Sequence, residues 1–254
     1  FLQKYATHAK ADMARQGLAL SFYAQKQYAQ AIPHLTALLA KGNLSKEIKR
    51  DRITMLQGQC LLRSGKKDEA KALFAREEGR LQEPSYKASA LAAICDVSFG
   101  KSEWEEVRKW TAKLLAGKLA PNQTARGLYQ QGFASYQLKK YAEASASLAK
   151  VQPLAADAIW KTRASYLLGE CFTIEKNHEK AEPAFVAALE GLQGADKAEC
   201  HLRLGVTRFI LKKWETASTA LEAYLKAERS TRPPDPKMDN PQCKQSTPYT
   251  SLDA

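Results

Sequence analysis

A small or aliphatic residue recurs along most of the chain at intervals of 36 to 39 residues. The six positions, which we call the anchors, are Ala31, Ala70, Val107, Ala144, Ala181 and Ala217. A sustained period of this length is typical of stacked copies of one supersecondary unit, each burying its apolar face against its neighbours. The spacing therefore predicts an array of six like units.

Three further positions keep step with the anchors. Small residues stand twelve positions before them: Ala19, Gly58, Cys95, Gly132, Gly169 and Gly205. Residues one helical turn after them are mostly large and apolar: Leu35, Phe74, Thr111, Leu148, Phe185 and Leu221. Mostly aromatic residues stand three positions before them: Tyr28, Lys67, Trp104, Tyr141, His178 and Trp214. Each unit is thus predicted to be a hairpin of two amphipathic helices, giving about twelve helices, no sheet, and close helix crossings at Gly58, Gly132, Gly169 and Gly205.

These residues resemble the tetratricopeptide repeat family, in which a Leu-Gly pair and an aromatic precede an Ala-x3-Phe motif. Leu168-Gly169-x2-Phe172 with Ala181-x3-Phe185 is the best copy, and the third unit, with Cys95, Val107 and Thr111, departs most. The resemblance covers roughly residues 14 to 228. It implies an all-α fold, a right-handed α-solenoid of about six helical hairpins, and a scaffold that binds a peptide or partner protein.

The period exceeds the family's usual 34 residues, and in this it resembles the looser arrays of bacterial cell-envelope proteins, such as outer-membrane assembly lipoproteins and periplasmic cell-division coordinators. That likeness favours the periplasm. Five cysteines without a pairing pattern favour a reducing compartment instead. The compartment is therefore left open, with the cell envelope slightly preferred.

The repeat boundaries divide the chain into three parts. We expect a helical extension over residues 1–13, the solenoid over 14–228, and a proline-rich extended tail over 229–254. The outer face of the last unit, drawn from Phe209, Trp214, Leu221 and Tyr224, needs a cover. We expect part of the tail to provide that cover or to lie along a groove, with Tyr249 and Leu252 as anchoring side chains. The chain begins without Met, as a processed or trimmed product would.

Signatures of catalysis and metal binding are missing from the sequence. Phosphate-binding loops, dinucleotide-binding loops, zinc-protease motifs and nucleophile elbows do not occur. The histidines have no partners at metal-ligand spacing, and no run of residues is apolar enough to span a membrane. The sequence thus predicts a non-enzymatic protein with neither cofactor nor metal, unless a catalytic domain precedes Phe1 or follows Ala254.

The concave wall of such a solenoid is lined by the first helix of each unit, and its residues alternate with the buried set. They are Arg52, Met55 and Gln59 in unit two, Arg126, Tyr129, Phe133 and Tyr136 in unit four, and Arg163, Tyr166 and Glu170 in unit five. Tyr and Arg commonly anchor protein partners, so the nine of these residues other than Met55 are predicted to bind a partner. Some of the rings could instead seal adjacent repeats. The groove lacks the Lys and Asn pattern with which family members clamp a C-terminal carboxylate, which disfavours a co-chaperone function.

An alternative partner follows from the charge. The net charge is +12, from 39 Lys and Arg against 27 Asp and Glu, and lysines recur at the turn inside every unit. They are Lys26, Lys66, Lys67, Lys101, Lys139, Lys140, Lys176, Lys212 and Lys213. Stacking could align them into a basic edge for nucleic acid or another acidic partner. The same lysines could simply complement the dipole at helix C-termini. Partner identity and oligomeric state are not determined by the sequence.

Overall fold

The computed structural model describes residue 8, residues 10–154 and residues 156–231. These residues form twelve α-helices, one 3-10 helix (Glu78–Arg80) and no strand. The α-helices are α1 (Ala11–Ala24), α2 (Tyr28–Leu39), α3 (Arg50–Arg63), α4 (Lys67–Glu77), α5 (Pro84–Gly100), α6 (Trp104–Leu115), α7 (Pro121–Gln137), α8 (Tyr141–Leu148), α9 (Ala158–Ile174), α10 (His178–Leu189), α11 (Gly194–Ile210) and α12 (Trp214–Thr231).

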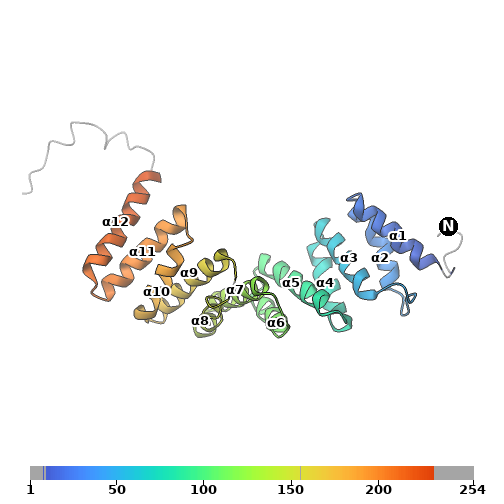
Figure 1. Ribbon diagram of the computed structural model, residues 1–254, viewed down its shortest axis with the longest axis horizontal. Helices are drawn as coiled ribbons and strands as arrows, with labels where there is room; N and C mark the ends of the chain where they lie inside the picture. Colours follow the sequence, from blue (N-terminus) through green and yellow to red (C-terminus); the bar gives the residue numbers. More distant parts are fainter. Residues whose placement is uncertain (1–7, 9, 155, 232–254) are drawn as a thin grey trace, which may run out of the picture.

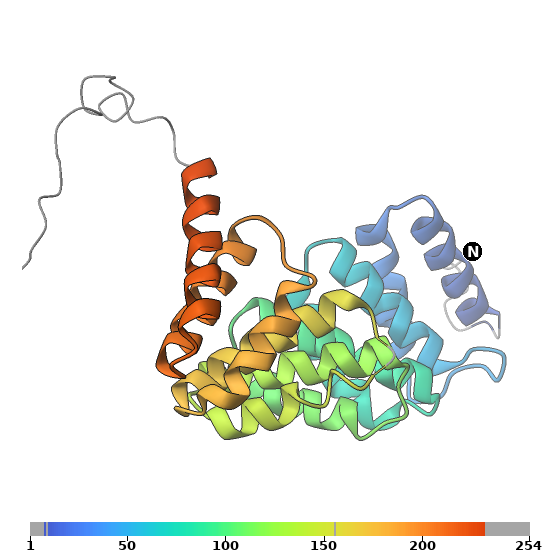
Figure 2. The same ribbon diagram turned by 60° about the vertical axis from the view of Figure 1, so that its left-hand side comes forward.

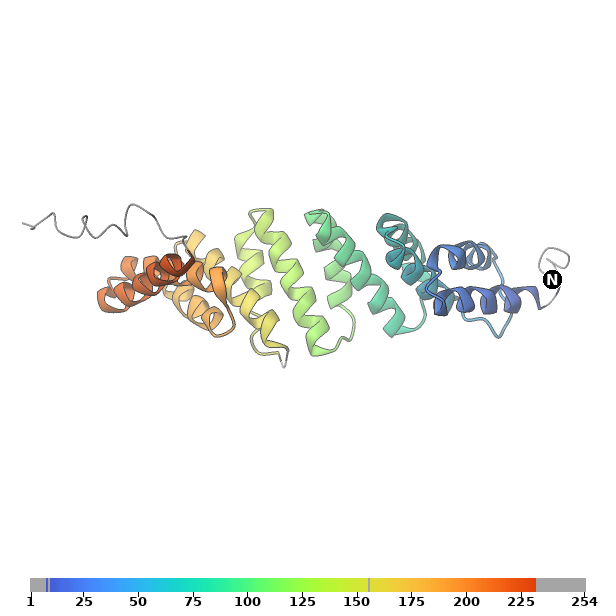
Figure 3. The ribbon, with the colours of Figure 1, turned by 90° about the horizontal axis from the view of Figure 1, so that it is seen from above.

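Successive helices pair as six hairpins, which we number units one to six from α1/α2 to α11/α12. The hairpins stand side by side along the long axis (Figure 3), and both ends of the array rise relative to its middle (Figure 1). In the second half, α7, α9 and α11 lie on the concave side, with α8, α10 and α12 outside them (Figures 1 and 2). The predicted all-α solenoid of six helical hairpins is confirmed.

Glycine allows the two helices of a hairpin to approach each other at the four predicted crossings. A Cβ atom placed on Gly58 would lie 1.9 Å from the ring of Phe74. At the other three glycines it would lie 2.6 Å from the large side chain sixteen residues later; the pairs are Gly132 with Leu148, Gly169 with Phe185, and Gly205 with Leu221. The side chains one turn after the anchors therefore occupy the space that the glycines leave free.

Unit three reaches the same packing with different residues. Cys95 replaces the glycine and Thr111 replaces the large apolar residue, and both are fully buried. The Thr111 hydroxyl donates a hydrogen bond to the Val107 carbonyl at 2.7 Å, which satisfies it inside the core. A larger residue on one helix is offset by a smaller one on the other, so the crossing is preserved.

The turn inside each hairpin places one residue in the left-handed region of backbone conformation. Gly65 does so in unit two with φ of 77°. The other units use non-glycine residues with φ of 59° to 60°: Lys26, Ser102, Lys139, Lys176 and Lys212. Such residues carry a steric cost of about 1 to 2 kcal/mol. The turn lysines are thus held at fixed places at the hairpin ends.

The buried cysteines are part of this core. Cys60, Cys95, Cys171 and Cys200 are each 0% exposed. Burial raises the pKa of the Cys60 thiol to about 11 and those of the other three to about 12. All four are therefore uncharged and shielded from reagents at neutral pH.

The two ends of the array extend slightly past the predicted solenoid. Helix α1 begins at Ala11 and α12 ends at Thr231, while the division into residues 1–13, 14–228 and 229–254 stays a prediction. Phe209 and Trp214 are 59% and 57% exposed on the last unit. Leu221 was wrongly expected on that outer face, because it packs inside the unit against Gly205. The predicted anchors Tyr249 and Leu252 lie outside the described residues.

Candidate protein-binding groove

A cavity of about 310 Å³ opens where the first helices of units four, five and six meet on the concave side. We call it the groove pocket. It is lined by Tyr129 and Phe133 of α7, Arg163, Tyr166 and Leu167 of α9, Leu192 of the loop between α10 and α11, and Asp196 and Glu199 of α11. Four of the nine predicted partner-binding residues, Tyr129, Phe133, Arg163 and Tyr166, are thus brought together at one place.

Aromatic rings form a continuous series at the pocket. The ring centroid of Phe133 lies 5.1 Å from that of Phe99, 5.5 Å from Trp104 and 6.0 Å from Tyr129. The Tyr129 ring lies 5.9 Å from Trp160 in turn. Distances of this size are those of favourable aromatic pairs. Phe133 therefore packs between units three and four, as expected if the rings seal adjacent repeats. It also lines the cavity.

Arg163 supplies a positive charge beside these rings. Its guanidinium carbon lies 5.7 Å from the Trp160 ring centroid, which holds it by a cation–π contact. The side chain is exposed and forms no ion pair within the part of the chain that the structure describes. Burial raises the pKa of the neighbouring Tyr129, and the Arg163 charge partly opposes that rise. The phenol thus stays neutral and can donate or accept hydrogen bonds.

Asp196 and Glu199 of α11 give the pocket an acidic rim. A third carboxylate, that of Glu170 on α9, is connected to Glu199 through Arg203. The Nε atom of Arg203 lies 3.3 Å from Glu170 Oε1 and 3.0 Å from Glu199 Oε1. Burial raises the pKa of Glu170; Arg203 opposes this and Glu199 adds to it. Asp196 is exposed in the first turn of α11 and has no ion-pair partner among the described residues. Arg203 thus forms ion pairs with two of the three carboxylates, those of Glu170 and Glu199.

Two other predicted residues have structural contacts instead. Arg126 forms an ion pair with Asp96 of unit three, whose Oδ1 also accepts a hydrogen bond from Gln130 Nε2 at 2.8 Å. The ring of Tyr136 packs edge-on against Tyr141 of the same hairpin, with centroids 5.6 Å apart. Arg126 therefore links units three and four, and Tyr136 packs within unit four.

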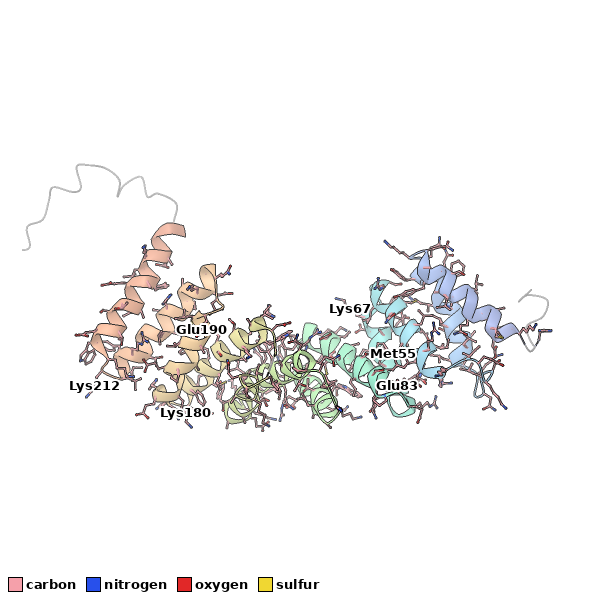
Figure 4. All side chains as sticks on the ribbon, viewed as in Figure 1. Met55, Lys67, Glu83, Lys180, Glu190 and Lys212 are labelled. Atoms are coloured by element: carbon pink, nitrogen blue, oxygen red, sulfur yellow. The ribbon has the colours of Figure 1, made fainter. Side chains whose placement is uncertain are left out.

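The predicted residues of unit two lie apart from the groove pocket. Arg52 is exposed on α3, and Gln59 Oε1 accepts a hydrogen bond of 3.1 Å from the hydroxyl of Tyr23 in unit one. The expectation that Met55 lines the groove is wrong, since its side chain packs into the core of units one to three and is only 9% exposed (Figure 4). Unit two thus contributes a polar surface without an apolar cavity.

Sequence reasoning missed the residues that α11 and its preceding loop contribute. Glu199 could have been found, because it stands eighteen positions before its anchor, as Arg52, Arg126 and Arg163 do. Leu192 and Asp196 come from the segment between units, where the repeat gives no register. Their place in the pocket depends on how one hairpin turns relative to the next.

The turn lysines are partly neutralised. Four of the nine are ion-paired: Lys66 with Glu69, Lys101 with Asp68, Lys140 with Glu105, and Lys213 with Glu182. Lys212 lies at the lower left border of the array in Figure 4, whereas Lys67 lies on the upper side of the ribbon. Neither finding supports a single straight basic strip. Nucleic-acid binding along this edge stays an alternative prediction.

Larger cavities, of about 740 and 580 Å³, lie at the loops that precede α3 and α5. Their walls are mainly charged and polar side chains such as Lys49, Arg50 and Arg80. Ligand-binding pockets are usually apolar with a few polar groups, so the smaller groove pocket is the better candidate site.

Features of other protein classes are not found in the described part of the chain. Each helix there is too short or too polar to cross a lipid bilayer. No cluster of three or more His, Cys, Asp and Glu side chains among those residues could hold a metal ion.

Comparison with known proteins shows what the array is similar to. A model of the tetratricopeptide repeat family matches residues 17–83, and no curated protein sequence matches the chain. The C-terminal part of a TPR repeat-containing protein from Cytophaga hutchinsonii aligns with a TM-score of 0.60 and 17% identity, over 92% of this chain and 98% of that one. YrrB, described as a TPR protein with an unusual peptide-binding site, aligns with a TM-score of 0.57 and 19% identity, over 70% and 87%. MamA from Desulfovibrio magneticus RS-1 aligns with a TM-score of 0.55 and 21% identity, over 72% and 97%. At these identities the structural matches establish the fold.

Proposed function

We propose that this chain, whose residues 17–83 match a model of the tetratricopeptide repeat family, is an interaction scaffold that holds a peptide segment of a partner protein in the groove pocket. The protein acts by binding rather than by catalysis in this proposal. The cell envelope as its location is a separate proposal, which rests on the repeat length alone.

One observation carries the proposal: a concave cavity brings half-buried aromatic rings, a held arginine and a carboxylate rim together from three consecutive units. Apolar pockets with a few directed polar groups are the usual form of a binding site. Aromatic residues and arginine are also the commonest binding hot spots. The peptide-binding site ascribed to YrrB supports a peptide as the ligand class for this fold.

The pocket residues differ in how much they contribute to packing between units and in how much we expect them to contribute to partner binding. Phe133 is held by rings from two units, so its removal would disturb the array as well as the pocket. Among the described residues Tyr166 pairs with one other ring, that of Phe185, at 6.0 Å between centroids, and its side chain shares a hydrogen bond with Arg203 of unit six. Tyr166 and Arg163 have fewer ring contacts between units than Phe133, so we expect them to contribute most to partner binding.

The test is capture of the partner through the pocket. A photo-crosslinking amino acid at Leu192 identifies what binds there in the native source, and the affinity of the purified partner is then measured for two variants. Tyr166→Ala is expected to weaken binding by about 2 kcal/mol, or roughly 30-fold. Tyr141→Ala is the matched control, because this half-buried tyrosine of α8 lies outside the pocket.

Both variants must retain the helical circular dichroism of the parent. Equal losses of affinity in the two variants would contradict the proposal. So would unchanged binding by Tyr166→Ala together with a lower melting temperature, which would make the ring a structural seal.

A further inference from the structure

Unit six carries a group of uncovered apolar side chains, which we call the end face. Val206, Phe209 and Ile210 of α11 are 46%, 59% and 48% exposed, and Trp214 and Leu225 of α12 are 57% and 48% exposed. Helices α11 and α12 are the last in the part of the chain that the structure describes (Figure 1), so no further hairpin of that part covers them. Terminal repeats usually present a polar outer face, and an exposed apolar patch marks an interaction site.

Two rings of the end face form a pair that recurs along the array. Phe209 and Trp214 stand eight and three positions before their anchor and pack edge-on, with centroids 5.2 Å apart. Residues at the same two positions pack edge-on in three earlier units: Tyr23 with Tyr28, Phe99 with Trp104, and Tyr136 with Tyr141, at 5.5, 5.5 and 5.6 Å. Those six rings are partly buried, whereas Phe209 and Trp214 are exposed. Unit six therefore has the same aromatic pair as the earlier units but lacks its cover.

The earlier pairs show what packs on such a surface. In unit three it is Phe133, from the first helix of unit four, whose ring centroid lies 5.1 Å from Phe99 and 5.5 Å from Trp104. In unit one it is Arg63, from the first helix of unit two, whose guanidinium carbon lies 5.8 and 5.5 Å from the two tyrosine ring centroids. The occupant in both cases is a flat side chain on a helix of the next unit. Continuing this interface at unit six requires a helix that presents such a side chain.

A carboxylate beside the pair adds a requirement for positive charge. Asp68 and Glu105 stand two positions before the anchors of units two and three, and each forms an ion pair with a turn lysine of the following unit, Lys101 and Lys140 respectively. Glu215 stands at the same position in unit six, in the first turn of α12. It is exposed and has no ion-pair partner among the described residues. A complementary ligand therefore carries a lysine near this acid.

From these contacts we infer that the end face is a second interaction surface, separate from the groove pocket, and that it binds an amphipathic helix of a partner protein as unit three binds unit four. The helix places an aromatic side chain on Phe209 and Trp214 and a lysine at Glu215. The corresponding residues of unit four, Phe133 and Lys140, are seven positions apart. The partner helix therefore carries an aromatic residue followed by a lysine seven positions later.

A second copy of the chain matches this surface poorly. Stacked head to tail on unit six, it would present unit one, which has Leu20 and Gln27 at the positions of Phe133 and Lys140. Such a copy lacks both the ring and the charge. Residues 232–254, expected from the sequence to provide a cover, lie outside the described residues, and the experiment distinguishes them from a partner helix.

A helical probe of known sequence tests the surface on the full-length protein. The probe is a peptide of residues 121–140, which carries Phe133 and Lys140 at the required spacing. A lactam bridge holds it as a helix, because isolated helices of this length are only marginally stable. In isotope-labelled protein we expect the peptide to shift the indole signal of Trp214 in a saturable way. A Phe133→Ala peptide should bind at least tenfold more weakly.

A charge exchange separates the predicted contact from general electrostatics. A Lys140→Glu peptide should bind the parent protein at least tenfold more weakly, and Glu215→Lys in the protein should restore its binding. Glu179→Lys is the matched control, because Glu179 is an exposed acid two positions before the anchor of unit five, where unit six is already packed. It should leave both affinities unchanged.

Four results would overturn the inference. Two are an unshifted Trp214 signal at the highest soluble peptide concentration, and equal binding of the parent and Lys140→Glu peptides. A concentration-dependent dimer that Trp214→Ala abolishes would make the occupant a second copy. Peptide binding that appears only after deletion of residues 232–254 would assign the surface to the chain's own segment. The scaffold proposal stands apart from all four, since its test is loss of the groove partner by Tyr166→Ala.

Discussion

The surroundings of two carboxylates, Glu77 in unit two and Glu170 in unit five, shift their pKa values in opposite directions. Burial raises the pKa of Glu77, but hydrogen bonds from Arg50 and Arg76 and their charges outweigh it, so its pKa is lowered. Burial also raises the pKa of Glu170, and there Arg203 fails to compensate, so its pKa stays raised. The first carboxylate is stabilised as an anion by the fold and the second is not.

The difference lies in what each cluster faces. Arg50 Nε donates to Glu77 at 3.0 Å, and its other nitrogens donate to the carbonyls of Leu39 and Lys41 at 2.9 and 3.1 Å. That network closes the junction of units one and two. Glu170 Oε1 receives no hydrogen bond of good geometry, although Arg203 is near. A satisfied buried network fixes a structure, whereas Glu170 retains an acceptor atom without a hydrogen-bond partner.

The largest expected effect on stability comes from replacing Glu77. Glu77→Leu should destabilise the fold by up to about 3 kcal/mol, because it leaves the partly buried Arg50 charge without its partner. Adding Arg50→Met should recover most of the loss, since units one and three carry Leu38 and Leu114 at the position of Glu77. Urea unfolding followed by circular dichroism measures both. A single variant as stable as the parent would show that the network contributes little.

Substitutions at the glycine crossings test whether the helices of unit two and unit five pack in the same way, although their carboxylates differ. Gly58→Ala and Gly169→Ala should each destabilise by about 1 to 3 kcal/mol through overpacking, because the added Cβ would meet Phe74 or Phe185. Gly17→Ala on α1 is the control, with no neighbouring atom within 4 Å. It should be neutral or stabilising by up to about 1 kcal/mol. Tolerance of alanine at Gly169 but not at Gly58 would mean that the halves are packed differently.

These crossings also show what the sequence could predict. Gly169 and Phe185 belong to one hairpin and lie sixteen residues apart, so the repeat alone places them in contact. The same register predicted that Tyr129 and Tyr166 lie on the concave side, and both line the groove pocket. It gave no indication of the ion pair between Arg126 and Asp96, because Asp96 belongs to the preceding unit. Contacts between units depend on how each hairpin turns relative to the next, and a repeat spacing carries no measure of that rotation.

The smallest expected effect is a pH dependence in the groove. Glu170 has a raised pKa in the folded protein, so the fold prefers its protonated form. The stability associated with that form is present below the unfolded pKa of about 4.3 and is lost as pH rises through the higher folded value. Glu170→Gln mimics the protonated form, while Arg203 retains Glu199.

The variant should therefore match the parent at low pH and exceed it at neutral pH by at most about 1 kcal/mol. Midpoints of urea unfolding at pH 4 and pH 7.5 measure the two differences. The Glu77 cluster has the opposite sign, because a lowered pKa gives stability that is lost as pH falls. A Glu170→Gln protein less stable than the parent at pH 7.5 would mean that the ion pair with Arg203 outweighs burial, and the contrast between the two carboxylates would not hold.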